Sequence, residues 1–222
     1  MVAVQTKDDT KIRMLQNSNF LFHYLYQLNK DIMNKLMKIS LWVLSSLFVL
    51  VVLFMFLVWP IMKNNTKKHS PEQNISYSQG DLEINAFYCS PSKKGRTIFG
   101  ELVPYGEVWR TGANEASTFT TNKDLIIGEK TLEKGTYTLW TIPGENTWDV
   151  IFNSEMYGWG VKFTDQTASR NPDYDALVVT VPVSKSLTVT ENFKISFSEI
   201  ESGIIMTLAW DTTVVPVLLQ EK

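Results

Sequence analysis

The chain has 222 residues, of which 44% are hydrophobic, 12% aromatic and 20% charged, and this composition excludes a disordered or collagen-like protein. A formal net charge of −2 leaves no basic excess to neutralise phosphates, so we expect no nucleic-acid partner. The single cysteine, Cys89, excludes an intrachain disulfide and a cysteine-rich metal site, and His23 and His69 fall outside the region expected to fold, so we expect neither a metal nor a cofactor.

The first predicted element is a transmembrane helix over residues 39–62. This region contains no charged residue and is long enough as a helix to cross about 30 Å of hydrocarbon. Trp42 and Trp59 lie near its ends, where indole rings favour the membrane interface. A cleavable signal peptide is the alternative, since Lys35 and Lys38 precede the run. The run exceeds the roughly 7–15 apolar residues of a signal peptide and no small-residue cleavage site follows, so we favour an uncleaved anchor.

Basic residues flank both ends of the apolar run and do not orient it by themselves. Three further basic residues favour a cytoplasmic N-terminus: Lys7, Lys11 and Arg13. Residues 1–38 are therefore expected to form a cytoplasmic segment, unless part of them extends upstream of the natural start. The C-terminal part of the chain is expected outside the cytoplasm, because long C-terminal domains translocate largely regardless of their charge.

After the apolar run the sequence predicts a tether and then an all-β domain. Residues 63–74 contain no aliphatic residue and indicate a solvated tether. Over residues 75–222 hydrophobic residues recur with a period of two, and no amphipathic helix of useful length appears, so we predict a β-sandwich or jelly roll. Pro143 and Gly144 predict a type II turn in a hairpin. The expected strands are 82–88, 125–127, 136–142, 148–153, 176–183, 192–197, 203–210 and 212–217.

Residues 88–120 interrupt the strand pattern with a long loop. Its run KGRTIFGELVPYGEVWRTGANEAST, followed later by GTYTLWTIPGENTWDVIFN, resembles the bacterial domain-of-unknown-function 2911 family from about Tyr77 to Val217. The resemblance implies a compact extracytoplasmic β domain and no particular reaction. With the predicted anchor, it implies a single-pass protein of the inner (cytoplasmic) membrane whose domain faces the periplasm. Cys89 stands where the family pattern has arginine, and the anchor replaces the commoner cleavable signal.

The loop 96–115 and a later Tyr-Gly-Trp-Gly run carry the candidate ligand-binding residues. An arginine offers two parallel donors to a carboxylate or phosphate, hydroxyl and carboxamide groups add neutral hydrogen bonds, and an indole offers a stacking surface. The structural alternative is a loop that satisfies its own polar groups, with Arg110 paired to Glu115. The candidates are Arg96, Trp109, Arg110, Thr111, Asn114, Glu115 and Trp159.

Two functions of different kinds remain open at this stage. The first is a membrane-anchored module that binds a small polar, anionic or saccharide ligand. The second is a non-catalytic subunit of an envelope membrane complex, with Ser45 and Ser46 as a contact point for a partner helix. Catalysis is the least favoured, because it would depend on pairing Glu115 with Glu101, Glu107 or Asp149, and acidic pairs of this kind are common. We therefore assign no catalytic residue.

Overall fold

The computed structural model describes the backbone of residues 5–222 and the side-chain environments of residue 22, residues 25–61 and residues 65–222. It forms two compact units, Met1–Met62 and Lys63–Lys222. The basic side chains used above to orient the chain, Lys7, Lys11 and Arg13, lie outside these described side chains.

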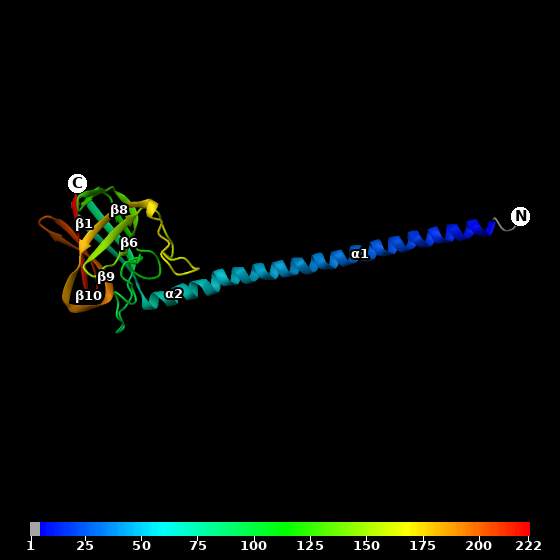
Figure 1. Cartoon of the computed structure of the whole chain (residues 1–222), viewed down its shortest axis with the longest axis horizontal. Helices are drawn as coiled ribbons and strands as arrows, with labels where there is room; N and C mark the ends of the chain where they lie inside the picture. Colours follow the sequence, from blue (N-terminus) through cyan, green and yellow to red (C-terminus); the bar gives the residue numbers. More distant parts are fainter. Residues whose placement is uncertain (1–4) are drawn as a thin grey trace. The chain divides into compact units, whose positions relative to one another are not determined.

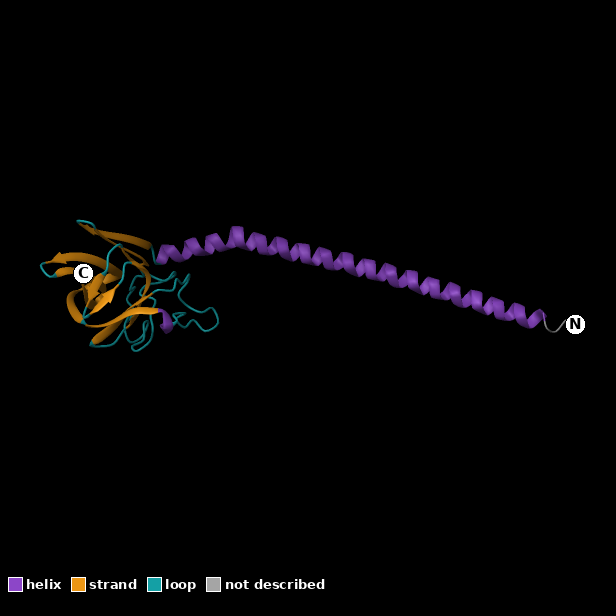
Figure 2. Cartoon of the chain, turned by 90° about the horizontal axis from the view of Figure 1, so that it is seen from above, coloured by secondary structure: helices purple, strands orange, loops and turns teal. Residues whose placement is uncertain are grey.

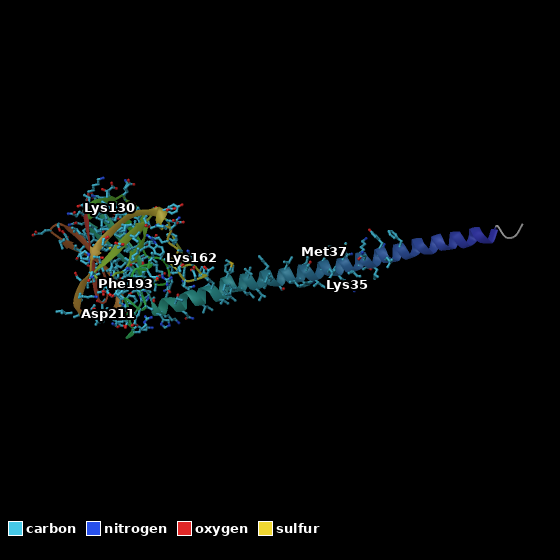
Figure 3. The ribbon with its side chains drawn as sticks, viewed as in Figure 1. Lys35, Met37, Lys130, Lys162, Phe193 and Asp211 are labelled. Carbon is cyan, nitrogen blue, oxygen red and sulfur yellow. The ribbon has the colours of Figure 1, made fainter. Side chains whose placement is uncertain are left out.

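The N-terminal unit is helical. Helix α1 covers Gln5–Leu53, a π-helical turn η1 covers Phe54–Val58, and helix α2 covers Trp59–His69. The π-helical turn has a local cause, because Pro60 has no amide hydrogen to donate and its ring crowds the carbonyl of residue 56. Among the described residues one helix is long and apolar enough to cross a membrane. Most of its described side chains are exposed, and Lys35 and Met37 project from it (Figure 3).

The segment expected to be a tether, 63–74, is ordered in the structure. Helix α2 continues to His69, with Lys67, Lys68 and His69 in its last turn. Positive side chains at this position interact favourably with the negative end of the helix dipole. The first strand then begins at Glu72, ahead of the expected boundary at residue 75. The pattern of hydrophobic residues did not predict this continuation, because the end of α2 and the first three residues of β1 contain no aliphatic side chain.

The C-terminal unit is an antiparallel sandwich, which confirms the predicted fold class (Figures 1 and 2). One sheet has six strands in the order β1-β2-β3-β6-β7-β8, and the other has four in the order β5-β4-β10-β9. A short 3₁₀ helix, Pro172–Tyr174, precedes β8. The strands are β1 Glu72–Gln79, β2 Leu82–Cys89, β3 Thr118–Thr121, β4 Leu125–Ile127, β5 Lys130–Leu132, β6 Gly135–Ile142, β7 Thr147–Asn153, β8 Asp175–Pro182, β9 Ser184–Ile200 and β10 Gly203–Glu221.

Strand β10 joins two strands that the sequence predicts separately. Alternate residues face the core up to Trp210, and the buried positions shift by one from Thr213 onward. The shift occurs at Asp211, which has a φ of 56° and lies at an irregularity in the pairing with β9. A β-bulge of this kind adds one residue to the strand, so the apolar side chains on both sides of it reach the same core.

The hairpin between β6 and β7 forms as predicted, but the prediction of a type II turn is wrong. A type II turn requires a positive φ at Gly144, and Gly144 does not have one. A Cβ atom at this position would lie 2.5 Å from the carbonyl oxygen of Thr147. Glycine is therefore needed here for the close approach of two backbone segments rather than for left-handed geometry.

Apolar side chains fill the space between the sheets, and a second, smaller cluster lies elsewhere on the domain. The main core contains Trp148 and Trp210, which are both 2% exposed. The second cluster is built on Trp140, which is fully buried and packs edge-on against Tyr157 with ring centroids 5.3 Å apart. Tyr157 belongs to the loop between β7 and β8, so this loop is held against β6 by aromatic packing.

Candidate functional site

The long loop between β2 and β3, residues 90–117, is fixed to strands of both sheets. The amide of Lys93 donates to the carbonyl of Glu191 in β9 over 2.7 Å. Trp109 and Thr141 of β6 exchange backbone hydrogen bonds of 2.7 and 3.0 Å. Because the loop is attached at two points far apart in the sequence, its side chains stand in defined positions although it contains no regular strand.

A cavity of about 600 Å³ opens beside this loop. Residues from the end of α2, the hairpin-like turn 160–169 after β7, and β10 complete its lining. Among the described side chains, no aspartate or glutamate lines it. The apolar lining includes Leu102, Val103, Val108, Trp109, Val161 and Trp210, and the basic lining consists of Lys94, Arg96 and Arg110 with His69.

The aromatic part of the lining is anchored in the core. The rings of Trp109 and Trp210 stack with centroids 5.9 Å apart and an interplanar angle of 17°. Phe193, labelled in Figure 3, packs edge-on against Trp109 at 5.0 Å. The Trp109 indole N–H donates to the Gly112 carbonyl and the Trp210 indole N–H to the Glu191 carbonyl. Trp210 is 2% exposed and supports the half-buried Trp109 from below. Because the indole donor of Trp109 is used within the protein, the accessible part of this ring offers a ligand apolar contact.

Arg96 and Lys94 are exposed basic residues of the cavity lining. The Arg96 guanidinium donates to the carbonyls of Lys93 and Ser92 over 3.0 and 2.6 Å. These bonds hold the guanidinium in place without neutralising its charge. Lys94 Nζ lies 3.3 Å from Nδ1 of His69. Two exposed positive charges are therefore present where a ligand could enter.

Arg110 is the half-buried cation of the cavity. Its Nη1 donates to the carbonyl of Trp159 over 3.0 Å. Burial lowers the pKa of Arg110, while Cys89 and Glu115 act in the opposite direction. Among the described side chains, Arg110, Arg96 and Lys94 form no ion pair with a carboxylate. The anticipated pairing of Arg110 with Glu115 is therefore not formed as an ion pair.

Four of the candidate residues do not line the cavity: Thr111, Asn114, Glu115 and Trp159. Thr111 and Asn114 are buried with φ values of 54° and 56°, and both shape the loop backbone. The Thr111 hydroxyl donates to Thr141 Oγ1 over 3.2 Å, and the Asn114 carboxamide donates to the Ser70 carbonyl over 3.3 Å. These side chains hold the loop to β6 and to the end of α2.

Glu115 lies in a separate network with Cys89 and Lys67. The Cys89 thiol donates to Glu115 Oε2 over 3.3 Å, and Lys67 Nζ lies 3.5 Å from Glu115 Oε1. Burial, with Glu115 as the next cause, raises the pKa of the buried Cys89 thiol to about 11. A thiol that stays protonated at neutral pH is not a nucleophile. This network connects the end of α2 to the sandwich.

Trp159 is half-buried and is not part of the cavity lining. Its contribution is the backbone carbonyl that accepts from Arg110. The next residue, Gly160, has a φ of 74°, and a Cβ there would lie 3.2 Å from both Cβ and Cδ of Arg110. Of the seven candidate residues, the structure thus brings Arg96, Trp109 and Arg110 together at the cavity.

The sequence missed three contributors to the cavity. Lys94 could have been found from the basic run that includes Arg96. Trp210 and His69 had no local signal, because they come from distant segments that meet only in the fold. The expectation that both histidines lie outside the folded domain is wrong for His69, which α2 carries to the cavity.

The fold and the cavity define a class of protein: an antiparallel β-sandwich with a cavity that has basic side chains in its lining, preceded by a helix long and apolar enough to cross a membrane. The chain belongs to the DUF2911 family of proteins of unknown function, whose model matches residues 70–219 and confirms the resemblance seen in the sequence. No curated protein and no solved structure is significantly similar to the chain.

Proposed function

We propose that the chain is a membrane-anchored binding protein whose extracytoplasmic sandwich holds a small anionic ligand in the cavity beside residues 96–115. One observation carries the proposal. Three basic side chains, Lys94, Arg96 and Arg110, line the cavity, and no carboxylate among the described side chains lines it with them. Basic groups without acidic partners attract an anion, and a guanidinium can bind a carboxylate or phosphate through two donors.

The positions of these cations fit a ligand that enters from solvent. Lys94 and Arg96 are exposed, so they attract an anion at modest strength because water screens their charges. Arg110 is half-buried, and an ionic hydrogen bond to it is stronger because the surroundings are less polar. A cavity of about 600 Å³ lies within the range that accommodates small molecules.

The bond from Arg110 to the Trp159 carbonyl favours a second reading, in which Arg110 only clamps the turn after β7 and the protein is a structural subunit of a membrane complex. The two readings differ in what a conservative substitution does. Arg110→Lys keeps the charge and loses the planar fork, so it weakens anion binding in the first reading and lowers stability alone in the second.

Binding can be tested by calorimetric titration of the purified full chain with inorganic phosphate, glucose 6-phosphate, glucuronate and neutral glucose. We expect at least one of the three anions to bind and glucose to bind more weakly, because only the anions use the basic lining. Lys94→Gln should weaken anion binding, whereas Lys194→Gln, the same charge change on an exposed part of β9, should not. The absence of heat and of thermal stabilisation with all three anions would refute the proposal.

A further inference from the structure

We infer that the anion bound in the cavity is the head group of an anionic phospholipid. This inference rests on the anion-binding function proposed above and names the class of ligand. A phosphate ester joined to a hydrocarbon body combines the two kinds of surface that the cavity lining offers: basic side chains and a larger set of apolar ones. A free phosphate or sugar phosphate would use only the first of these.

Exposed apolar side chains beside the cavity are the first support. Leu102, itself a lining residue, is 45% exposed. Phe163 is 74% exposed at the tip of the turn 160–169, whose residues Val161 and Gln166 line the cavity. The turn is closed by hydrogen bonds from Lys162 to Thr167 and from Gln166 to Lys162, so its tip is held outward, and Figure 3 shows Lys162 on it. Leu102 and Phe163 therefore give a ligand bound in the cavity apolar side chains to contact outside it.

The length of the connecting chain is the second support. His69, which lines the cavity, follows residue 62, the end of the uncharged apolar run, by the short segment 63–69. At no more than about 3.5 Å per residue this segment reaches roughly 25 Å even when fully extended. If the apolar run crosses the bilayer, this limit keeps one wall of the cavity near the lipid surface. A membrane lipid is then present at high local concentration, and its capture costs little association entropy.

The distribution of charge in the domain is the third support, and it favours recognition of a single head group. From residue 63 onward acidic residues outnumber basic ones, so the domain as a whole is not attracted to an anionic surface. Lys93, next to Lys94 in sequence, pairs with Asp211 at 2.5 Å, whereas Lys94 and Arg96 form no such pair with a described carboxylate. The pattern favours one anionic head group over adsorption to a charged surface.

The test uses the full chain in lipid nanodiscs, with thermal unfolding of the sandwich followed by tryptophan fluorescence. Three samples are compared: phosphatidylcholine discs, discs that also contain phosphatidylglycerol, and phosphatidylcholine discs with soluble glycerol phosphate. We expect phosphatidylglycerol to raise the Tm by about 3–5 °C, as a ligand well above its Kd does for a domain of this size. Glycerol phosphate should raise it less, because it lacks the hydrocarbon body.

Two variants and one control connect any Tm rise to the cavity. Lys94→Gln should remove the rise caused by phosphatidylglycerol, and Lys194→Gln should preserve it. Leu102→Ser should reduce the rise caused by phosphatidylglycerol and leave the effect of glycerol phosphate unchanged, because only the lipid uses the apolar rim. All three positions are exposed, so the Tm in pure phosphatidylcholine should stay near that of the natural chain.

The possible outcomes separate this inference from the function on which it rests. Stabilisation by glycerol phosphate with none by phosphatidylglycerol would overturn the lipid assignment and keep the anion-binding function. A lipid effect that survives Lys94→Gln would place the lipid elsewhere and also overturn the assignment. No stabilisation by either compound, together with the absence of heat in the soluble-anion titration, would refute both.

Discussion

At the scale of single residues, the geometry of the cavity depends on how closely Gly160 approaches Arg110. The φ of 74° at Gly160 places it in the left-handed region, and its missing Cβ leaves room for the arginine side chain. Arg110 can then reach the Trp159 carbonyl while remaining part of the cavity lining. A residue with no polar side chain therefore contributes to the position of the half-buried cation.

We predict that Gly160→Ala lowers the free energy of unfolding by about 1–2 kcal/mol, the usual cost of a left-handed non-glycine residue. It should also weaken anion binding, because the new Cβ would displace Arg110. Gly158→Ala is the matched control, since Gly158 has no positive φ and a Cβ there would meet nothing within 4 Å. Denaturant unfolding of the full chain measures both variants, and equal stability of the two would contradict this account.

The buried thiol of Cys89 gives a prediction about pH. Its pKa is raised from 9.0 to about 11 in the folded state. Below pH 9 the thiol is protonated in both states, so its contribution to stability is fully present. Between pH 9 and 11 the unfolded chain releases this proton and the folded chain keeps it, so stability falls as the pH rises.

Cys89→Ala should remove this part of the pH dependence. Unfolding of the natural chain and of the variant, compared from pH 8 to 11, should show a shallower decline for the variant. A thiol reagent at pH 8 should modify Cys89 only after denaturant is added, since the residue is buried. Rapid modification of the native protein would show that the side chain is accessible and that the raised pKa is wrong.

At the scale of elements, the hairpins determine which side chains share a face. In the β6–β7 hairpin, Trp140 pairs with Ile151, and both belong to the cluster beneath the loop that follows β7. The opposite face of β7 sends Trp148 and Val150 into the main core. A change of register by one residue would exchange these two sets, so the turn has to fix the register.

Gly144→Ala should destabilise the domain through this turn. Its Cβ would lie 2.5 Å from the Thr147 carbonyl oxygen, which belongs to the backbone and cannot move without shifting β7. We expect a loss of about 1–3 kcal/mol, within the range for local backbone strain. Glu145→Ala, an exposed change in the same turn, should alter stability by less than about 0.5 kcal/mol. Denaturant titration monitored by tryptophan fluorescence gives both values.

At the scale of the whole molecule, the proposed function requires the sandwich to lie outside the cytoplasm. The helix that precedes it is apolar enough to be a membrane span or signal anchor. Its flanking basic residues do not settle the orientation, and the residues that favour a cytoplasmic N-terminus lie in the first part of the chain.

Orientation can be measured with an introduced cysteine at the exposed position Asn65. A membrane-impermeant maleimide should label Asn65→Cys in intact spheroplasts, because this position follows the apolar run. The natural chain is its own control, since its one cysteine is buried. Labelling of Asn65→Cys only after lysis would reverse the proposed topology and remove the sandwich from the periplasm.

Local patterns in the sequence were sufficient for the class of fold. Alternating hydrophobicity identified strands such as 82–88 and 136–142, because a half-buried strand shows its two faces directly in its own residues. The uncharged run 39–62 identified the long apolar helix for a similar reason. Local patterns failed where geometry depends on a contact with distant backbone, as at Gly144, and where a bulge joins two strand segments, as at Asp211.

The candidate site shows the same division more sharply. By itself the sequence determined that residues 96–115 belong to a long loop that interrupts the strand pattern, and that arginine and tryptophan side chains there could hold a ligand. Only the tertiary structure decided that Thr111, Asn114 and Glu115 hold the loop, whereas His69, Lys94 and Trp210 join Arg96, Trp109 and Arg110 at one cavity. The physical reason is that a cavity is formed by side chains from segments far apart in the chain, and no local pattern records which of them will meet.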